Sequence, residues 1–146
     1  MNPSLVYLAQ TETTAGFLSQ NTNALTCIKN RPLGKSFLIS ADSFETLKTF
    51  TRIPRVHRHI VRKAHKTTFV YPCKLAIRVV KDTAHLQFLR KLKWSYSTSS
   101  NLSGRVFDKE FAQENAEVIV FTCKDFFESK PSSIIRLGKS KMKKLR

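Results

Sequence analysis

Residues 97–104 read Ser97-Thr98-Ser99-Ser100-Asn101-Leu102-Ser103-Gly104 and follow an apolar, strand-like lead-in. The stretch combines five small hydroxyl side chains with one amide and one glycine. Such a segment gathers hydrogen-bonding groups at one point and lets the backbone come close to a ligand. A surface loop rich in Ser, Thr and Asn is the alternative interpretation of the same residues.

Other short motifs lie upstream and downstream of this stretch. They are Thr11-Glu12-Thr13, Lys29-Asn30-Arg31-Pro32, Ala76-Ile77-Arg78-Val79 and Pro131-Ser132-Ser133-Ile134. In this order the motifs make the chain resemble the YrdC-like family of threonylcarbamoyl-AMP synthases. The pattern of that family has Thr-Glu/Asp-Thr, Lys-x-Arg-Pro, a Val-Arg strand, Ser-x-Ser-Ala-Asn-x-Ser-Gly and Pro-Ser-Thr-Ile. The resemblance spans nearly the whole chain.

The resemblance implies both a fold and a reaction. The fold is α/β (α+β), an open twisted mixed β-sheet with flanking helices and a concave basic face. Helices and strands that interleave without a repeat are compatible with it. The reaction joins L-threonine, bicarbonate and ATP into threonylcarbamoyl-AMP and pyrophosphate, for the threonylcarbamoyladenosine modification of tRNA. ATP is then a substrate, Mg²⁺ is left open as its companion, and no protein-bound metal is expected.

The binding residues of the family carry over motif by motif. The resemblance implies ATP-binding roles for Lys29, Arg31, Lys35, Ser99, Asn101 and Arg146, and threonine-binding roles for Thr13, Arg78, Ser97 and Ser132. No residue is assigned a catalytic role beyond positioning, because such chemistry rests largely on positioning and charge stabilisation. A lysine beside an arginine suits the spread charge of phosphates. Exposed loop charges are the alternative interpretation of Lys29, Arg31 and Lys35.

Arg78 has a physical argument of its own. It lies in an apolar, strand-like run, where an unpaired charge is costly, so an anionic partner is expected. The resemblance makes that partner the threonine carboxylate. An edge-strand arginine that points to water is the alternative.

The chain departs from the family pattern at positions that shape the site. Gln10 replaces a proline, Ala15 a tyrosine and Ser40 a histidine, and Ala64-His65-Lys66 replace Pro-Gly-Pro. The connection between the strands of Thr68 and Arg78 is short, and the usual N-terminal helix is missing. Retained activity therefore does not follow from the motifs alone.

The charge of the chain suggests a second function. Lys and Arg total 26 against 10 Asp and Glu, a formal net charge of +16. Residues 52–93 hold twelve Lys and Arg and one acid, Asp82, and the tail at about 138–146 is basic as well. Such charge favours an anionic partner, either nucleic acid or nucleotide phosphate. A non-catalytic module that binds double-stranded RNA or tRNA is therefore the alternative function, and a ribosome-associated or maturation factor is a weaker one.

Length and composition set the remaining expectations. A chain of 146 residues with 41% hydrophobic residues fits one domain over 1–146. No apolar run approaches the roughly 20 residues that span a bilayer, and the N-terminus lacks signal-peptide features, so a cytoplasmic protein without a membrane partner is predicted. Other proteins of the tRNA-modification pathway are candidate partners. Cys27, Cys73 and Cys123 are too far apart for a metal-ligand pair and are expected in the core.

Apolar patterns and capping residues predict the secondary structure. Strands are expected at 4–9, 36–40, 67–71, 75–80, 94–98, 118–122 and 132–137. Helices are expected at 21–29, 42–50, 54–64, 82–93 and 107–116. The Thr11–Gly16 segment is predicted to be a loop, and no element is predicted after residue 137.

Overall fold

The computed structural model describes residues 1–30, 36–101, 107–121 and 125–146. The strands of these residues are β1 (Tyr7–Gln10), β2 (Ala15–Ser19), β3 (Leu38–Ala41), β4 (Thr67–Val70), β5 (Ala76–Val79), β6 (Trp94–Ser99), β7 (Val118–Ile119), β8 (Ser133–Leu137) and β9 (Met142–Lys144). The helices are α1 (Thr22–Lys29), α2 (Phe44–Phe50), the 3₁₀ turn η1 (Arg55–His57), α3 (Arg58–Lys63), α4 (Thr83–Leu89) and α5 (Lys109–Glu114).

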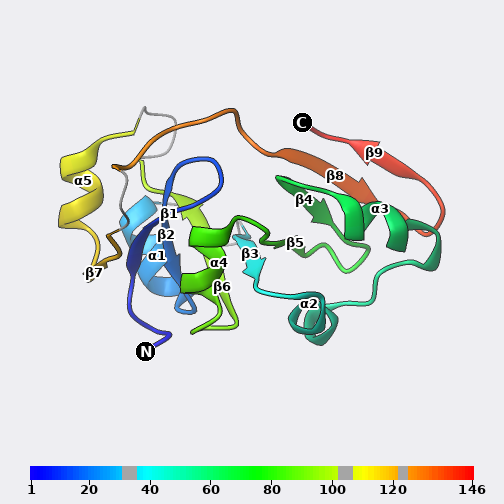
Figure 1. Ribbon diagram of the computed structural model, residues 1–146, viewed down its shortest axis with the longest axis horizontal. Helices are drawn as coiled ribbons and strands as arrows, with labels where there is room; N and C mark the ends of the chain where they lie inside the picture. Colours follow the sequence, from blue (N-terminus) through cyan, green and yellow to red (C-terminus); the bar gives the residue numbers. More distant parts are fainter. Residues whose placement is uncertain (31–35, 102–106, 122–124) are drawn as a thin grey trace.

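The strands form one open mixed sheet. Their order is β7-β1-β2-β6-β3-β5-β4-β8-β9, and the pairs β1–β7, β3–β5 and β4–β8 are parallel while the others are antiparallel. The sheet runs along the long axis of the molecule, with α1 and α5 at one end and α3 and β9 at the other (Figure 1). The expected open mixed sheet with flanking helices is therefore present.

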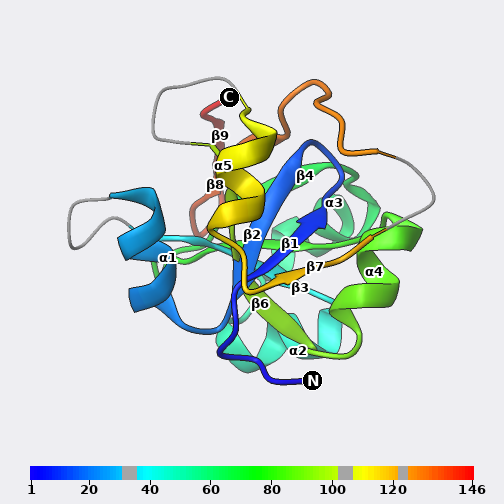
Figure 2. The same ribbon diagram turned by 90° about the vertical axis from the view of Figure 1, so that its left-hand side faces the viewer.

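Strand β1 alternates its side chains between two helical layers, as strand geometry requires. Leu8 packs in a core with Phe17, Leu25 of α1 and Ala112 of α5. Its neighbour Tyr7 points to the other face and packs on Phe88 of α4 with ring centroids 5.4 Å apart. The two layers lie on either side of β1 and β2 in Figure 2.

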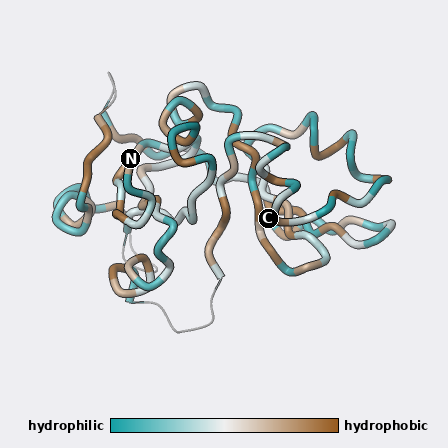
Figure 3. The backbone as a smooth tube through the Cα atoms, turned by 90° about the horizontal axis from the view of Figure 1, so that it is seen from below, coloured by the Kyte–Doolittle hydropathy of each residue, from teal (hydrophilic) through white to brown (hydrophobic). Residues whose placement is uncertain are grey.

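A third core fills the other half of the molecule. It joins Leu47 of α2 and Val61 of α3 to β-strand residues such as Phe69 and Ile77. Hydrophobic stretches (brown) occur in both halves of the molecule and alternate with hydrophilic ones (teal) in Figure 3. The cores therefore stabilise the two halves of the sheet on either side of the cavity described below.

The predicted helices are confirmed in position, but their ends differ. Asn21 and Asp82 cap α1 and α4, since their side-chain oxygens accept hydrogen bonds from backbone N–H groups of the first turn. Helix α2 begins at Phe44 and not at residue 42, and its cap is Ser43, whose hydroxyl accepts a hydrogen bond from the backbone N–H of Thr46. The helix expected at 54–64 begins as a 3₁₀ turn, and α4 ends at Leu89 rather than near residue 93.

Strands β2 and β9 correct the prediction. Residues 15 and 16 belong to β2, whose five positions are all buried between β1 and β6, so only the 11–14 segment is a turn. Strand β9 lies in the basic tail and pairs with β8. The expected core cysteines are also wrong for Cys27 and Cys73, which are exposed, and Cys123 lies outside the described residues. Among the helices of the described part, none has the length and apolar character needed to cross a bilayer.

Candidate functional site

A cavity of about 410 Å³ opens where the two halves of the sheet meet. Residues of the β1–β2 turn, of β2, β3, β5 and β6, and of the chain before β8 and after β9 surround it. Its walls consist of Thr11, Thr13, Thr14, Gly16, Leu38, Arg78, Ser97, Thr98, Ser99, Glu128, Ser129, Pro131, Ser132 and Arg146. Most of these side chains carry hydroxyl groups, so the cavity suits a small polar ligand.

Arg78 of β5 is the buried charge of this cavity, with 6% of its surface exposed. Its Nε and Nη2 donate to the Thr68 hydroxyl at 3.2 and 3.1 Å, and Nη2 also donates to the Ser132 hydroxyl at 2.7 Å. Its Nη1 lies 3.8 Å from a carboxylate oxygen of Glu12. Burial lowers the pKa of Arg78, the Glu12 charge raises it again, and the charge of Arg146 lowers it further. Because an arginine keeps its proton through such shifts, a fixed positive charge lines the cavity.

Arg146 brings a second guanidinium to the same wall. Its Nε donates to the Ser132 carbonyl at 3.0 Å and its Nη2 to the Ser132 hydroxyl at 3.3 Å. Backbone hydrogen bonds between Arg146 and Ile134 hold the residue beyond the end of β9. Ser132 therefore contacts both arginines, and the two cations share one side of the cavity.

The hydroxyl stretch forms another part of the wall. Ser97, Thr98 and Ser99 lie in the last half of β6 and line the cavity. Ser100 turns inward, where its backbone N–H and its hydroxyl both donate to the Ala15 carbonyl. Gly16 faces this wall, and a Cβ on it would lie 3.0 Å from the Thr98 carbonyl oxygen. A glycine at position 16 thus allows β2 and β6 to approach closely beside the cavity.

Lys29 lies beside the cavity rather than on its wall. Only 4% of its surface is exposed. Its ammonium donates to the Ser99 carbonyl at 2.9 Å, to the Asn101 side-chain oxygen at 3.1 Å and to the Asn101 carbonyl. The Ser99 hydroxyl donates to the same Asn101 side chain at 2.6 Å. Lys29 and Asn101 therefore hold the end of β6, a contact that the expected role in phosphate binding did not include.

The segment 125–132 crosses the upper side of the molecule from the β7 end to β8 (orange in Figure 1). Gln10 anchors it, since its amide exchanges hydrogen bonds with the backbone of Phe127 at 3.1 and 3.2 Å. The Ser129 backbone N–H donates to the Thr13 carbonyl at 2.7 Å. Gln10, which replaces the family proline, thus helps to hold the segment that supplies Ser129 and Ser132.

Most of the predicted site residues meet at this cavity. Its walls contain Thr13, Arg78, Ser97, Ser99, Ser132 and Arg146. Arg31 and Lys35 lie outside the described residues. The sequence did not predict Glu12 or Thr68 as site residues. Glu12 stands between two motif threonines, which was an available signal, whereas Thr68 meets Arg78 through the register of the β4–β5 hairpin. Among the described residues, no three His, Cys, Asp or Glu side chains come together as metal ligands.

The chain was compared with known proteins. A family model named Sua5/YciO/YrdC, with the description telomere recombination, matches residues 8–146. The comparison with curated proteins found no match.

Solved structures resemble the fold. P. abyssi Sua5 complexed with L-threonine has a TM-score of 0.80 at 20% identity, and the match covers 97% of this chain and 50% of that one. E. coli YciO has a TM-score of 0.77 at 17% identity, with 98% and 82% covered. Full-length HypF in its phosphate- and nucleotide-bound form has a TM-score of 0.76 at 14% identity, with 97% and 26% covered. The chain thus spans about half the length of the Sua5 chain, and these likenesses confirm the expected fold class.

Proposed function

The chain belongs to the Sua5/YciO/YrdC family, and on that premise we propose that it is an L-threonylcarbamoyladenylate synthase. The proposed reaction forms threonylcarbamoyl-AMP and pyrophosphate from L-threonine, bicarbonate and ATP, and the product serves the threonylcarbamoyladenosine modification of tRNA. P. abyssi Sua5, which shares the fold, has been solved with L-threonine. That ligand comes to this chain only as part of the proposal.

The observation that carries the proposal is the guanidinium of Arg78 in a cavity walled by hydroxyl groups. A carboxylate accepts paired hydrogen bonds from a guanidinium fork, and the hydroxyl and ammonium groups of threonine can bond to neighbouring oxygens. Ser97, Ser132 and Thr13 supply such oxygens in the walls of the same cavity. The proposed threonine site therefore consists of Arg78 and these three residues.

In the proposal, ATP would lie toward Arg146 and toward the motif that begins at Lys29. Arg146 lines the cavity, while Lys29 donates to the Ser99 carbonyl and to the Asn101 side chain. In the proposal Arg31 and Lys35 add charge for the phosphates, and Mg²⁺ accompanies the triphosphate. The chain's own contribution is to hold carboxylate and phosphates in place and to stabilise developing negative charge.

Calorimetry with L-threonine tests the proposal. We expect L-threonine to bind and ATP to strengthen that binding. Arg78→Gln should lower the affinity at least tenfold, because the fork is lost. The control is Arg136→Gln, an exposed arginine of β8, which should bind like the wild type. Absence of threonine binding with and without ATP, or unchanged binding by Arg78→Gln, would contradict the proposal. Pyrophosphate release that requires threonine and bicarbonate together would extend it to catalysis.

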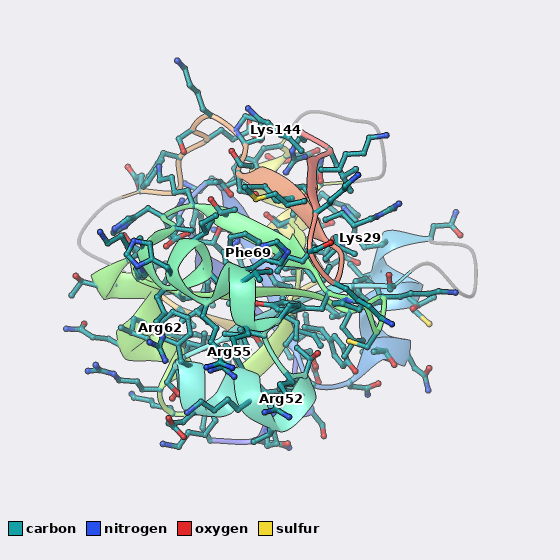
Figure 4. The ribbon with its side chains drawn as sticks, turned by 90° about the vertical axis from the view of Figure 1, so that its right-hand side faces the viewer. Lys29, Arg52, Arg55, Arg62, Phe69 and Lys144 are labelled. Atoms are coloured by element: carbon teal, nitrogen blue, oxygen red, sulfur yellow. The ribbon has the colours of Figure 1, made fainter. Side chains whose placement is uncertain are left out.

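One further observation favours RNA binding as a second candidate function. The His57 ring lies 3.1 Å from the Gly138 carbonyl oxygen, so η1 and the β8–β9 hairpin adjoin each other. The hairpin carries exposed lysines, and η1 together with α3, which directly follows it, carries exposed basic residues as well. We call this surface the basic end, and it consists of Arg55, Arg62, Lys63, Lys139, Lys141 and Lys143. Figure 4 views this end of the molecule and shows Arg52, Arg55 and Arg62 on one side and Lys144 on the other. A surface of this charge attracts the phosphates of RNA, with or without catalysis in the cavity.

A further inference from the structure

Glu12 lies directly behind the cavity. Its neighbours Thr11 and Thr13 line the cavity, whereas the side chain of Glu12 turns into the protein and is only 4% exposed. A carboxylate in the interior is costly unless charges or hydrogen bonds compensate it. The partners of Glu12 therefore indicate why the fold retains a charge at this position.

The two carboxylate oxygens of Glu12 have different partners. Oε1 accepts from the backbone N–H groups of Lys81 and Asp82 at 3.2 and 3.1 Å. These two residues directly precede α4, and Asp82 is its N-cap. Oε2 has no hydrogen-bond partner among the described residues, and it lies 3.8 Å from Nη1 of Arg78. One oxygen thus holds the start of α4 while the other faces the guanidinium.

Arg78 is held differently at its two ends. Hydroxyl groups of Thr68 and Ser132 accept hydrogen bonds from Nε and Nη2. These neutral acceptors fix one edge of the fork. At Nη1 the contact that the described residues provide is the ion pair with Glu12. Because the guanidinium is planar and rigid, the hydroxyl groups and the Glu12 carboxylate act on one unit from its two ends, and the backbone of residues 81 and 82 keeps that carboxylate in place.

We infer that Glu12 is a positioning residue: its carboxylate fixes the Nη1 end of Arg78, so that the guanidinium presents a defined fork to an anionic group in the cavity. The identity of that group, the carboxylate of L-threonine, rests on the proposed function. Charge repulsion alone would have the opposite effect on affinity. A negative Glu12 repels a bound carboxylate, so removal of its charge would then strengthen binding. The sign of the effect of removing the charge therefore distinguishes positioning from simple repulsion.

Glu12→Gln provides this test. The amide keeps the size of the side chain but places an NH₂ group where an oxygen accepted, facing either the backbone N–H groups or Arg78. We expect the affinity for L-threonine, measured by calorimetry, to fall at least tenfold. The matched control is Glu114→Gln, which removes an exposed carboxylate of α5 and should leave the affinity unchanged. Affinity of Glu12→Gln equal to or above that of the wild type would overturn the inference.

A second readout does not depend on the ligand. Solvent exchange of the Arg78 Nε–H, followed by ¹⁵N NMR, reports directly how firmly the guanidinium is held. We expect exchange at least tenfold faster in Glu12→Gln than in the wild type, and equal rates would overturn the inference. If the wild type binds no L-threonine, the proposed function fails while this measurement still decides the role of Glu12. Should Glu12→Gln fail to fold, Glu12→Asp is the second variant, because it keeps the charge but withdraws it by one methylene. We expect the same faster exchange of the Arg78 Nε–H in Glu12→Asp. An exchange rate equal to that of the wild type would overturn the inference.

Discussion

At the scale of single residues, burial beside the cavity acts differently on two basic side chains. Arg78 is surrounded by hydroxyl groups and a carboxylate, and it remains a cation. His85 of α4 is 2% exposed, and its two ring nitrogens have no hydrogen-bond partner among the described residues. Burial and the positive charge of Arg78 lower the pKa of His85 to about 4, although Asp82 opposes the change. The imidazole is therefore neutral at physiological pH.

His85 should make the stability of the protein depend on pH. Its pKa is lower in the folded state than the ordinary value of 6.5, so the unfolded chain binds the proton more readily. The stabilising contribution is complete above pH 6.5 and is lost as the pH falls toward 4. The loss amounts to roughly 3 kcal/mol at about 1.4 kcal/mol per pH unit. Urea unfolding of wild type and His85→Gln between pH 7 and 4 measures it as the difference between the two curves.

The comparison needs a control for the removal of an imidazole. His65→Gln replaces an exposed histidine and serves this purpose in the same pH series. If wild type and His85→Gln lost stability in parallel down to pH 4, the neutral buried imidazole would be the wrong explanation.

The sequence indicated several residues that line the cavity but not the partners of those residues. Ordered motifs pointed to Arg78, Ser97 and Ser132, which the structure brings together at the cavity. The same motifs could not identify Thr68, whose contact with Arg78 depends on the strand register. Nor could they show that Lys29 donates to the chain itself at Ser99, since an exposed and a buried lysine have the same sequence pattern.

At the scale of elements, capping residues and apolar runs predicted the helices and most strands. Strand β2 was missed because glycine at position 16 is typical of a loop, while the reason for that glycine is the close carbonyl of Thr98 across the sheet. Strand β9 was missed because lysines dominate it. Its three residues are all exposed, and hydrogen bonds to β8, rather than an apolar face, define it.

Lys29 links helix α1 to the end of β6 through hydrogen bonds from its ammonium, and a substitution can remove them. Lys29→Met removes the ammonium and leaves the Ser99 carbonyl and the Asn101 oxygens without that donor. Loss of such a buried donor costs about 1–3 kcal/mol. We expect this loss in the free energy of unfolding, together with faster amide exchange around residues 99–101.

Lys48→Met is the matched control for this element. Lys48 lies in the last turn of α2 and forms an exposed ion pair with Glu45 at 2.6 Å, and such pairs contribute about 0–1 kcal/mol. Equal losses in the two variants, or unchanged exchange at residues 99–101 in Lys29→Met, would mean that Lys29 does not hold the end of β6.

At the scale of the whole molecule, a net charge of +16 on 146 residues opposes compactness through self-repulsion. The charge is not spread evenly. Residues 130–146 contain no acid at all, and they adjoin η1 through the contact between His57 and Gly138. Repulsion is therefore concentrated at the basic end, away from α5 and β7 (Figure 1). A polyanion bound there would relieve it.

Reversal of three charges at the basic end tests whether this surface binds RNA. The triple variant Arg55→Glu, Arg62→Glu and Lys141→Glu should weaken binding to an RNA duplex of about 16 base pairs. The slope of log K against log salt should become shallower by about one for each lost phosphate contact. Fluorescence anisotropy across a salt series measures both quantities.

The same change of charge elsewhere on the molecule distinguishes RNA binding at the basic end from attraction by the net charge of the protein. Arg90→Glu, Lys91→Glu and Lys109→Glu reverse three exposed charges on α5 and next to α4, in the other half of the molecule. If the basic end binds RNA, this second triple keeps the wild-type slope, because the contacted phosphates are still neutralised. Equal flattening of the slope by both triples would mean that net charge, and not a surface formed by η1, α3 and the β8–β9 hairpin, attracts the RNA. Binding of L-threonine should be the same in both triples, since neither includes a residue of the cavity.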